Sequence, residues 1–241
     1  MLWYKAWLET RSRFLASLCG ATLIVSFFAH HAESLTLPGP RANIYTRNVV
    51  FYSHQYLMFV WILCAILLGM GGLIRERAIG ASSFTLALPV SRTRLVVVRI
   101  AVGLLEAIAL GVVPWVAICL IMDSYGKPVL LSQAAFYLGL LISGGLIYFA
   151  LAVMTASLVE NEYTAPAVAY GITILMIVLC GNIAWLRPYA DLWRFMGGDN
   201  HLNKGTFFLS GPFPWSGAIA ALAVTTVLLA TSVWLIQHTE F

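Results

Sequence analysis

Few side chains in this sequence are suited to catalysis, and the histidines are the first to consider. All five lie at the ends of long apolar segments or in the connections between them: His30, His31, His54, His201 and His238. An intramembrane serine protease needs a histidine beside its nucleophilic serine at membrane depth. The segment 80–83, Gly-Ala-Ser-Ser, has only part of a G-x-S-G nucleophile pattern and lies in a strongly charged connection. The sequence therefore gives no support to intramembrane proteolysis.

Metal and nucleotide sites are not indicated either. His30, His31 and Glu33 are close in sequence, but adjacent histidines point in different directions on a helix and no H-x-x-x-H spacing occurs. No G-x-x-x-x-G-K-[ST] phosphate loop is present. The four cysteines show no C-x-x-C spacing; they are Cys19, Cys64, Cys119 and Cys180. We expect that the chain binds no metal or cofactor and is not an enzyme by itself.

Glu106 is the one ionisable residue inside a long apolar segment. A carboxylate at membrane depth is costly, which marks it as a functional candidate. Arg99 lies seven residues earlier and near the same helical face, so the alternative is a structural ion pair between Arg99 and Glu106. Pro114 in the same segment removes a backbone hydrogen bond and should kink the helix. Glu106 and Pro114 are therefore candidates for a role in gating or in substrate passage.

The composition defines the setting of these residues. The chain has 241 residues, of which 61% are hydrophobic and 10% charged, and its mean hydropathy is +0.87. Soluble domains have about 45–50% apolar and about 25% charged residues. The net charge of +4 does not point to nucleic acid, because most of the arginines lie beside apolar segments. The sequence predicts an all-α, polytopic membrane protein that forms a single transmembrane domain over residues 1–241.

Six apolar segments are long enough to cross a bilayer. The predicted spans are Phe14–Ala29, His54–Ile74, Leu95–Met122, Ser132–Leu158, Ala165–Leu186 and Trp215–Ile236. The first resembles a signal peptide, but Ala29-His30-His31-Ala32 lacks a small-x-small cleavage site, so we expect a retained span. Residues 1–13 have an amphipathic pattern, which predicts a helix lying in the membrane plane. The alternative is that they extend the first span inward.

The positions of lysine and arginine predict the orientation. With the amino terminus inside, eight basic residues face the cytoplasm and six face outward, and five of the inner ones lie between Arg75 and Arg99. We therefore expect both termini in the cytoplasm and a location in the cytoplasmic (inner) membrane.

The connection at residues 75–94 is the most informative segment. It is charged at both ends, and its apolar middle, Ile79–Leu88, is too short to cross a bilayer. A short helix there would present Phe84 and Leu88, one turn apart, to another protein. Pro89 would end that helix, and Ser91 could cap the next one. The segment is expected to be a cytoplasmic docking elbow.

In this segment the sequence resembles the type-2 ATP-binding-cassette (ABC) exporter permeases. Those proteins carry, after the second span, a Glu, a Gly four residues later and an apolar stretch that ends in Leu-Pro-Val-Ser-Arg. The matching positions here are Glu76, Gly80, Leu88, Pro89, Val90, Ser91 and Arg92. Ala81 departs from the hydroxyl residue that often follows the glycine. The outline of six spans with both termini inside is also similar.

The resemblance implies a function and its partners. The elbow would be a coupling helix that docks on a separate ATPase subunit, which would bind ATP and Mg2+. Arg75, Glu76 and Arg77 would make charge contacts with that subunit. A second docking element is expected between spans four and five, where Glu160 and Glu162 lie.

The other expectations concern assembly and the external side. A second permease copy would complete the transmembrane set, most simply as a homodimer within membrane lipid. The segment 187–214 would either form re-entrant helices that cap the pathway or be an interfacial loop anchored by its aromatic rings. The expected substrate is hydrophobic or amphipathic. The alternative function is a membrane anchor or immunity-type protein that binds a partner without transport.

Overall fold

The computed structural model describes residues 2–31, 42–70, 92–126, 128–159, 161, 164–183, 191–203 and 209–238. These residues form helices, with a single isolated bridge pairing Leu202 and Leu209. The long helices are α1 (Leu2–His31), α2 (Ala42–Gly69), α5 (Arg92–Ser124), α6 (Leu131–Leu158), α7 (Thr164–Asn182) and α10 (Trp215–His238). The short helix α9 (Leu192–Gly197) precedes α10.

The structure confirms the all-helical class and the six predicted spans. Within the described residues, six helices are long and apolar enough to cross a membrane, and they correspond one to one with the predicted segments. The chain is therefore a multi-pass membrane protein. Helix α2 begins at Ala42, twelve residues before the predicted start of the second span, because its polar first turns continue the helix beyond the apolar part.

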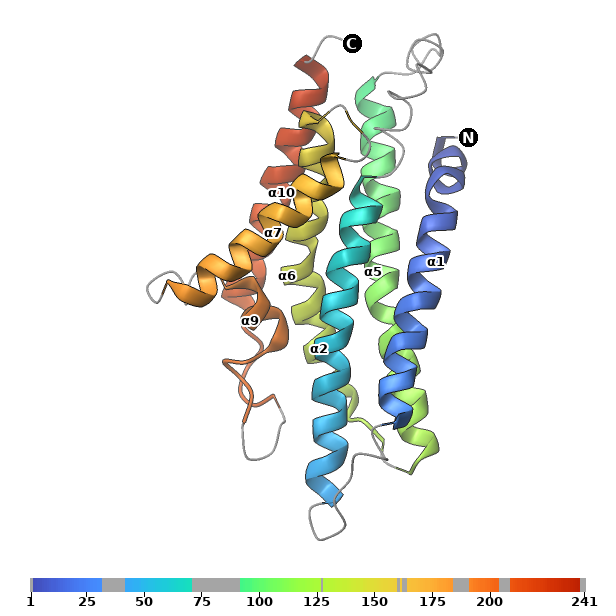
Figure 1. The fold of residues 1–241 in the computed structure, drawn as a ribbon, viewed down its shortest axis with the longest axis vertical. Helices are drawn as coiled ribbons and strands as arrows, with labels where there is room; N and C mark the ends of the chain where they lie inside the picture. The colour runs from blue at the N-terminus through green and yellow to red at the C-terminus, as the bar shows by residue number, and fades with distance from the viewer. Residues whose placement is uncertain are drawn as a thin grey trace.

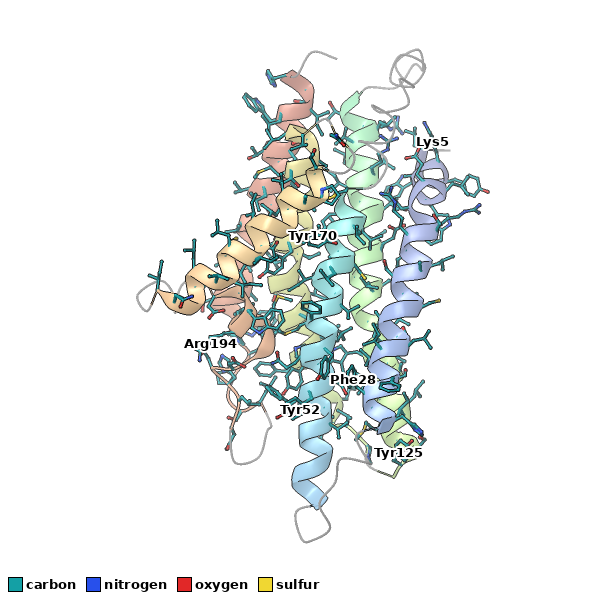
Figure 2. The ribbon with its side chains drawn as sticks, in the orientation of Figure 1. Lys5, Phe28, Tyr52, Tyr125, Tyr170 and Arg194 are labelled. Carbon is teal, nitrogen blue, oxygen red and sulfur yellow. The ribbon has the colours of Figure 1, made fainter. Side chains whose placement is uncertain are left out.

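The helices run alternately up and down the bundle, which gives it two distinct ends (Figure 1). We call the end where α1 begins and α10 ends the terminal end, and the opposite one the far end. Lys5 lies at the terminal end, whereas Tyr125 lies at the far end and Arg194 in the far half (Figure 2). Helix α7 leans away from the bundle, and its Tyr170 hydroxyl donates to the Leu63 carbonyl of α2 at 2.7 Å.

Glycines let α2 and α6 pack closely, as is common between membrane helices. A Cβ on Gly145 would lie 2.3 Å from the ring of Trp61, and one on Gly69 would lie 2.8 Å from the Phe149 carbonyl oxygen. The Trp61 indole also donates to the Ala107 carbonyl of α5 at 3.0 Å. These contacts make α2 and α6 the centre of the bundle, with α5 against both.

The structure corrects the prediction of a separate helix in the membrane plane at residues 1–13. Residues 2–13 continue the first span without a break, because α1 is one helix from Leu2 to His31. Its first turns run along α5 (Figure 1), where Glu9 and Thr10 have polar partners. The alternative, an inward extension of the first span, is the arrangement observed.

Helix α9 occupies part of the segment 187–214 and packs into the far half of the bundle. Asp191 caps it by accepting a hydrogen bond from the Arg194 amide, and Gly198 ends it in a left-handed conformation with φ of 69°. Phe195 lies between α6 and α10, where a Cβ on Gly144 or Gly217 would approach its ring to 2.9 or 2.7 Å. The segment is therefore partly helical and docked on the protein.

Candidate functional site

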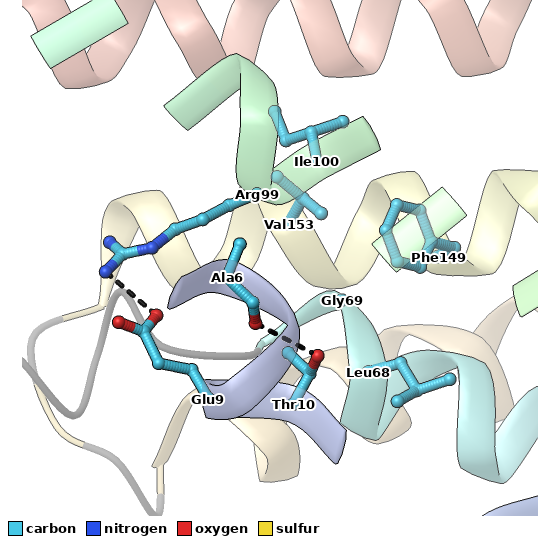
Figure 3. A pocket seen from close by; sticks show the side chains of 9 residues that line it. All are labelled: Ala6, Glu9, Thr10, Leu68, Gly69, Arg99, Ile100, Phe149 and Val153. Carbon is cyan, nitrogen blue, oxygen red and sulfur yellow. Dashed lines mark hydrogen bonds and ion pairs between the residues drawn. The ribbon is translucent and has the colours of Figure 1, made fainter. Parts of the chain in front are cut away.

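A polar cluster joins α1 to α5 in the terminal half of the bundle. We define it as Glu9 and Thr10 of α1 with Arg99 and Glu106 of α5. The Arg99 guanidinium lies 3.0 Å from a Glu9 carboxylate oxygen (Figure 3), and their side chains are 8% and 23% exposed. Lys5 lies 3.8 Å from the other Glu9 oxygen, one turn away. Glu9 therefore has one buried and one exposed cationic neighbour.

Glu106 is the most deeply buried member of the polar cluster. The Thr10 hydroxyl lies 2.5 Å from Glu106 Oε1 and also 3.2 Å from the Ala6 carbonyl oxygen. Glu106 Oε2 has no hydrogen-bond partner among the described residues. The carboxyl group is thus held by α1, so it is placed where two helices meet.

The partners within the polar cluster differ from the predicted ion pair between Arg99 and Glu106. Both residues lie near one face of α5 because they are seven positions apart, but α1 packs over that face and supplies a partner for each. Arg99 pairs with Glu9, and Glu106 contacts Thr10. Sequence analysis missed Glu9 and Thr10 as cluster members because their partners lie about ninety positions away.

A small cavity connects the polar cluster to the end of α2 (Figure 3). Its volume is about 20 Å3, and it is lined by Glu9, Thr10 and Arg99 on one side and by Leu68, Gly69 and Phe149 on the other. A cavity of this size has room for one water molecule. Gly69 is the last residue of α2, so the cavity lies where the chain leaves α2 for the predicted docking elbow.

The polar cluster joins the first turns of α5 to α1. Arg99 lies two turns after Arg92, the first residue of α5. A displacement of the chain before Arg92 would therefore reach α1 through the Glu9–Arg99 pair and the Thr10–Glu106 contact. Among the described residues, no group of three or more metal-ligating side chains occurs.

Most of the predicted docking residues lie outside the described residues. This holds for Arg75, Glu76, Arg77, Gly80, Phe84, Leu88, Pro89, Ser91, Glu160 and Glu162. Arg92 is the first residue of α5. Pro114 lies inside α5, which continues past it to Ser124. Both predicted docking elements are bounded by helix ends that lie at the terminal end: the end of α2 with the start of α5, and the end of α6 with the start of α7 (Figure 1).

A second buried cluster lies in the far half and includes a histidine that sequence analysis placed at a span end. That placement was wrong for His54, because α2 begins at Ala42 and His54 is fully buried inside it. Its ring lies 4.5 Å from that of Tyr137 and 5.6 Å from that of Trp115, between centroids. His54 Nε2 lies 2.9 Å from the Met196 carbonyl oxygen, which ties α2 to α9.

The acidic residues beside α9 form ion pairs with Arg194 in the far half of the bundle. Arg194 lies 3.6 Å from Asp199 and 4.0 Å from Asp191. Partial burial raises the pKa of the Asp199 carboxyl, Arg194 lowers it, and Asp191 raises it further. This group holds the loop after α9, and it contains no arrangement of a nucleophile and a base.

Comparison with known proteins adds no family assignment. No protein-family model matches the sequence, and no curated protein gives a significant match to it.

Proposed function

We propose that this chain is the permease subunit of a type-2 ABC exporter. In this proposal a separate ATPase subunit hydrolyses ATP with Mg2+, and the chain converts that cycle into export or flipping of a hydrophobic or amphipathic substrate. The observation that carries the proposal is the pattern from Glu76 to Arg92, between two membrane-spanning helices. Docking there needs no catalytic residue in the chain itself.

The connection between the docking elbow and the bundle supports this proposal. The elbow leads directly into α5, which is 33 residues long and continuous through Pro114. Helix α1 is joined to α5 by the polar cluster, so the two helices can move as a unit. A second docking element at Glu160 and Glu162 would act on α6 and α7 from the same end of the bundle.

The surface of the bundle supports assembly with another apolar surface. In α1, α7 and α10, only 22% of the most apolar 18-residue stretch of each helix is buried within the protein, whereas in α6 the share is 78%. Large apolar side chains such as Ile174, Leu175 and Val227 are exposed. These faces are suited to lipid and to a second permease copy, and we propose a homodimer in the inner membrane.

Co-expression with a cognate ATPase subunit would test the proposed function. We expect a stable complex with ATPase activity that responds to the permease. Glu76→Ala and Pro89→Ala should weaken the complex or uncouple that activity, because both change the docking elbow. Asp123→Ala is the matched control, since Asp123 is exposed at the opposite end of α5.

The proposal fails if no complex forms with that ATPase subunit. It also fails if a complex forms and both elbow variants leave its ATPase rate as unchanged as Asp123→Ala does. Expression and monodispersity of each variant would be checked first by size-exclusion chromatography.

A further inference from the structure

A recessed apolar cavity lies between α6 and α10, from the far end inward. We call it the outer groove, and its walls include Ser132, Ala135, Gly139, Ser143, Phe213 and Trp215. Its volume is about 510 Å3, within the range of about 300–1,000 Å3 typical of small-molecule sites. We propose that the outer groove binds one acyl chain of a membrane phospholipid. This inference does not depend on the proposed transport function.

The outer groove is hollow because small residues line one face of α6. Four of the six α6 residues that line it are small and recur at helical spacing, and they leave space beside the larger Phe136 and Ile142; the four are Ser132, Ala135, Gly139 and Ser143. The facing side of α10 carries Trp215, Ala218 and Leu222, which are also spaced along one helical face. The two helices therefore leave room between them without separating elsewhere.

Aromatic contacts hold the wall of the outer groove in place. Phe213 lies against α6 because residue 139 is a glycine, whose Cβ would otherwise lie 2.8 Å from the ring. The ring centroid of Phe213 is 5.3 Å from that of Phe136 and 4.9 Å from that of Trp215, both edge to face. The Gln133 side chain bonds both the amide and the carbonyl of Leu209 at 2.9 Å. The outer groove is thus formed before any ligand enters.

The depth of the outer groove matches one leaflet of a bilayer. From Ser132 to Ser143 the helix rises about 16 Å, at about 1.5 Å per residue. This is about half of the hydrocarbon core, which is about 30 Å thick. Trp215 is 67% exposed beside the mouth, at the first residue of α10. Tryptophan at a helix end is typical of the headgroup level, so the groove extends from that level toward the bilayer centre.

The shape of the outer groove favours an acyl chain over a helix of a second copy. A helix with its side chains is about 10–12 Å wide, so a helix of a second copy would lie across the open side of the outer groove without filling it. An acyl chain is slender, apolar and present at this depth. Ser132 at the exposed rim, with the His201 ring 5.8 Å from Phe136, provides polar groups near the headgroup level.

Photolabelling with a defined phospholipid would test the proposal. The intact chain, without an ATPase subunit, would be placed in nanodiscs of phosphatidylglycerol that contain a small fraction with a diazirine in one acyl chain. After irradiation, mass spectrometry would locate the labelled peptides. We expect labelling of 132–143 and 213–222 several-fold above that of exposed α7 residues such as Ile174 and Leu175.

Variants that fill the groove provide the decisive comparison. Ala135→Trp should reduce groove labelling at least fivefold, and Ser132→Trp, at the exposed rim, is the second variant if the first does not fold. Ala220→Trp is the matched control, because Ala220 is exposed on the opposite face of α10 and does not line the groove. It should leave labelling unchanged.

Three results would overturn the proposal. Equal labelling of the groove and of α7 would show ordinary solvation by lipid. Labelling that persists in a folded groove-filling variant would place the bound chain elsewhere. Groove peptides cross-linked to a second protein copy, in place of lipid, would make this surface a protein interface.

Discussion

At the scale of single residues, Glu9 of the first helix has its closer cationic partner on α5. Lys5 lies one turn before Glu9 in α1, and its ammonium nitrogen is 3.8 Å from a Glu9 carboxylate oxygen. The shorter contact of Glu9, at 3.0 Å, is with the more buried Arg99. An exposed pair one turn apart contributes about 0.3–0.5 kcal/mol, whereas removing one partner of a buried polar contact costs about 1–3 kcal/mol. The distant partner therefore dominates.

Removing each cationic neighbour of Glu9 should have very different effects on stability. Arg99→Ala should lower the free energy of unfolding by about 1–3 kcal/mol, because the partly buried Glu9 carboxylate loses its closer cationic partner. Lys5→Ala should change it by less than about 0.5 kcal/mol. Thermal loss of the monodisperse size-exclusion peak in detergent would show which of the two variants is less stable. Equal losses for the two variants would show that the Glu9–Arg99 pair does not hold α1 on α5.

At the scale of elements, close approach at glycines decides which helices form the centre of the bundle. Helices α2, α5, α6 and α10 are all strongly apolar, so apolar character alone does not choose neighbours within lipid. Gly145 beneath Trp61 and Gly69 beside Phe149 bring α2 against α6. In α7 a Cβ on Gly171 would meet nothing within 4 Å, as expected where that helix leans away.

The two glycines give a direct test of this packing. Gly145→Ala places a methyl group 2.3 Å from the Trp61 ring, and we expect a destabilisation of about 1–3 kcal/mol from overpacking. Gly171→Ala should be neutral, or stabilising by up to about 1 kcal/mol, because alanine is the better helix former. Unfolding in detergent would measure both. Rescue of Gly145→Ala by Trp61→Leu would identify the clash; failure of the single variant to destabilise would contradict the packing.

At the scale of the whole molecule, the alternating direction of the helices decides at which end of the bundle each helix begins and ends. The terminal end holds the start of α1, the end of α10, the end of α2 with the start of α5, and the end of α6 with the start of α7, whereas α9 lies in the far half (Figure 1). The outer groove lies between α6 and α10 and includes the first residues of both helices. A partner that docks on the elbow would therefore be separated from the outer groove by the bundle. Transport would require a change that passes along the helices, and α5 with the polar cluster provides a continuous path.

The predicted orientation can be tested with single cysteines in a background without the four native ones. Lys127→Cys lies in the connection after α5 and should react with an impermeant maleimide added to intact cells. Ser83→Cys, in the predicted elbow, should react only after permeabilisation, because the charged connection is expected inside. The reverse pattern would invert the topology and remove the elbow from the cytoplasm.

The sequence by itself determined the class of protein, the number of spans and most of their bounds. These are local properties, since a bilayer requires about 20 consecutive apolar residues and each such run is visible along the chain. The prediction for residues 1–13 was wrong, and the predicted partner of Glu106 was replaced by Thr10, because both depend on what packs beside them. Only the tertiary structure decided that Thr10 meets Glu106 across 96 positions, that His54 is buried beneath α9, and that a groove opens between α6 and α10. Contacts of this kind depend on the close packing of segments far apart in the chain, and a local sequence pattern does not show which segments will meet.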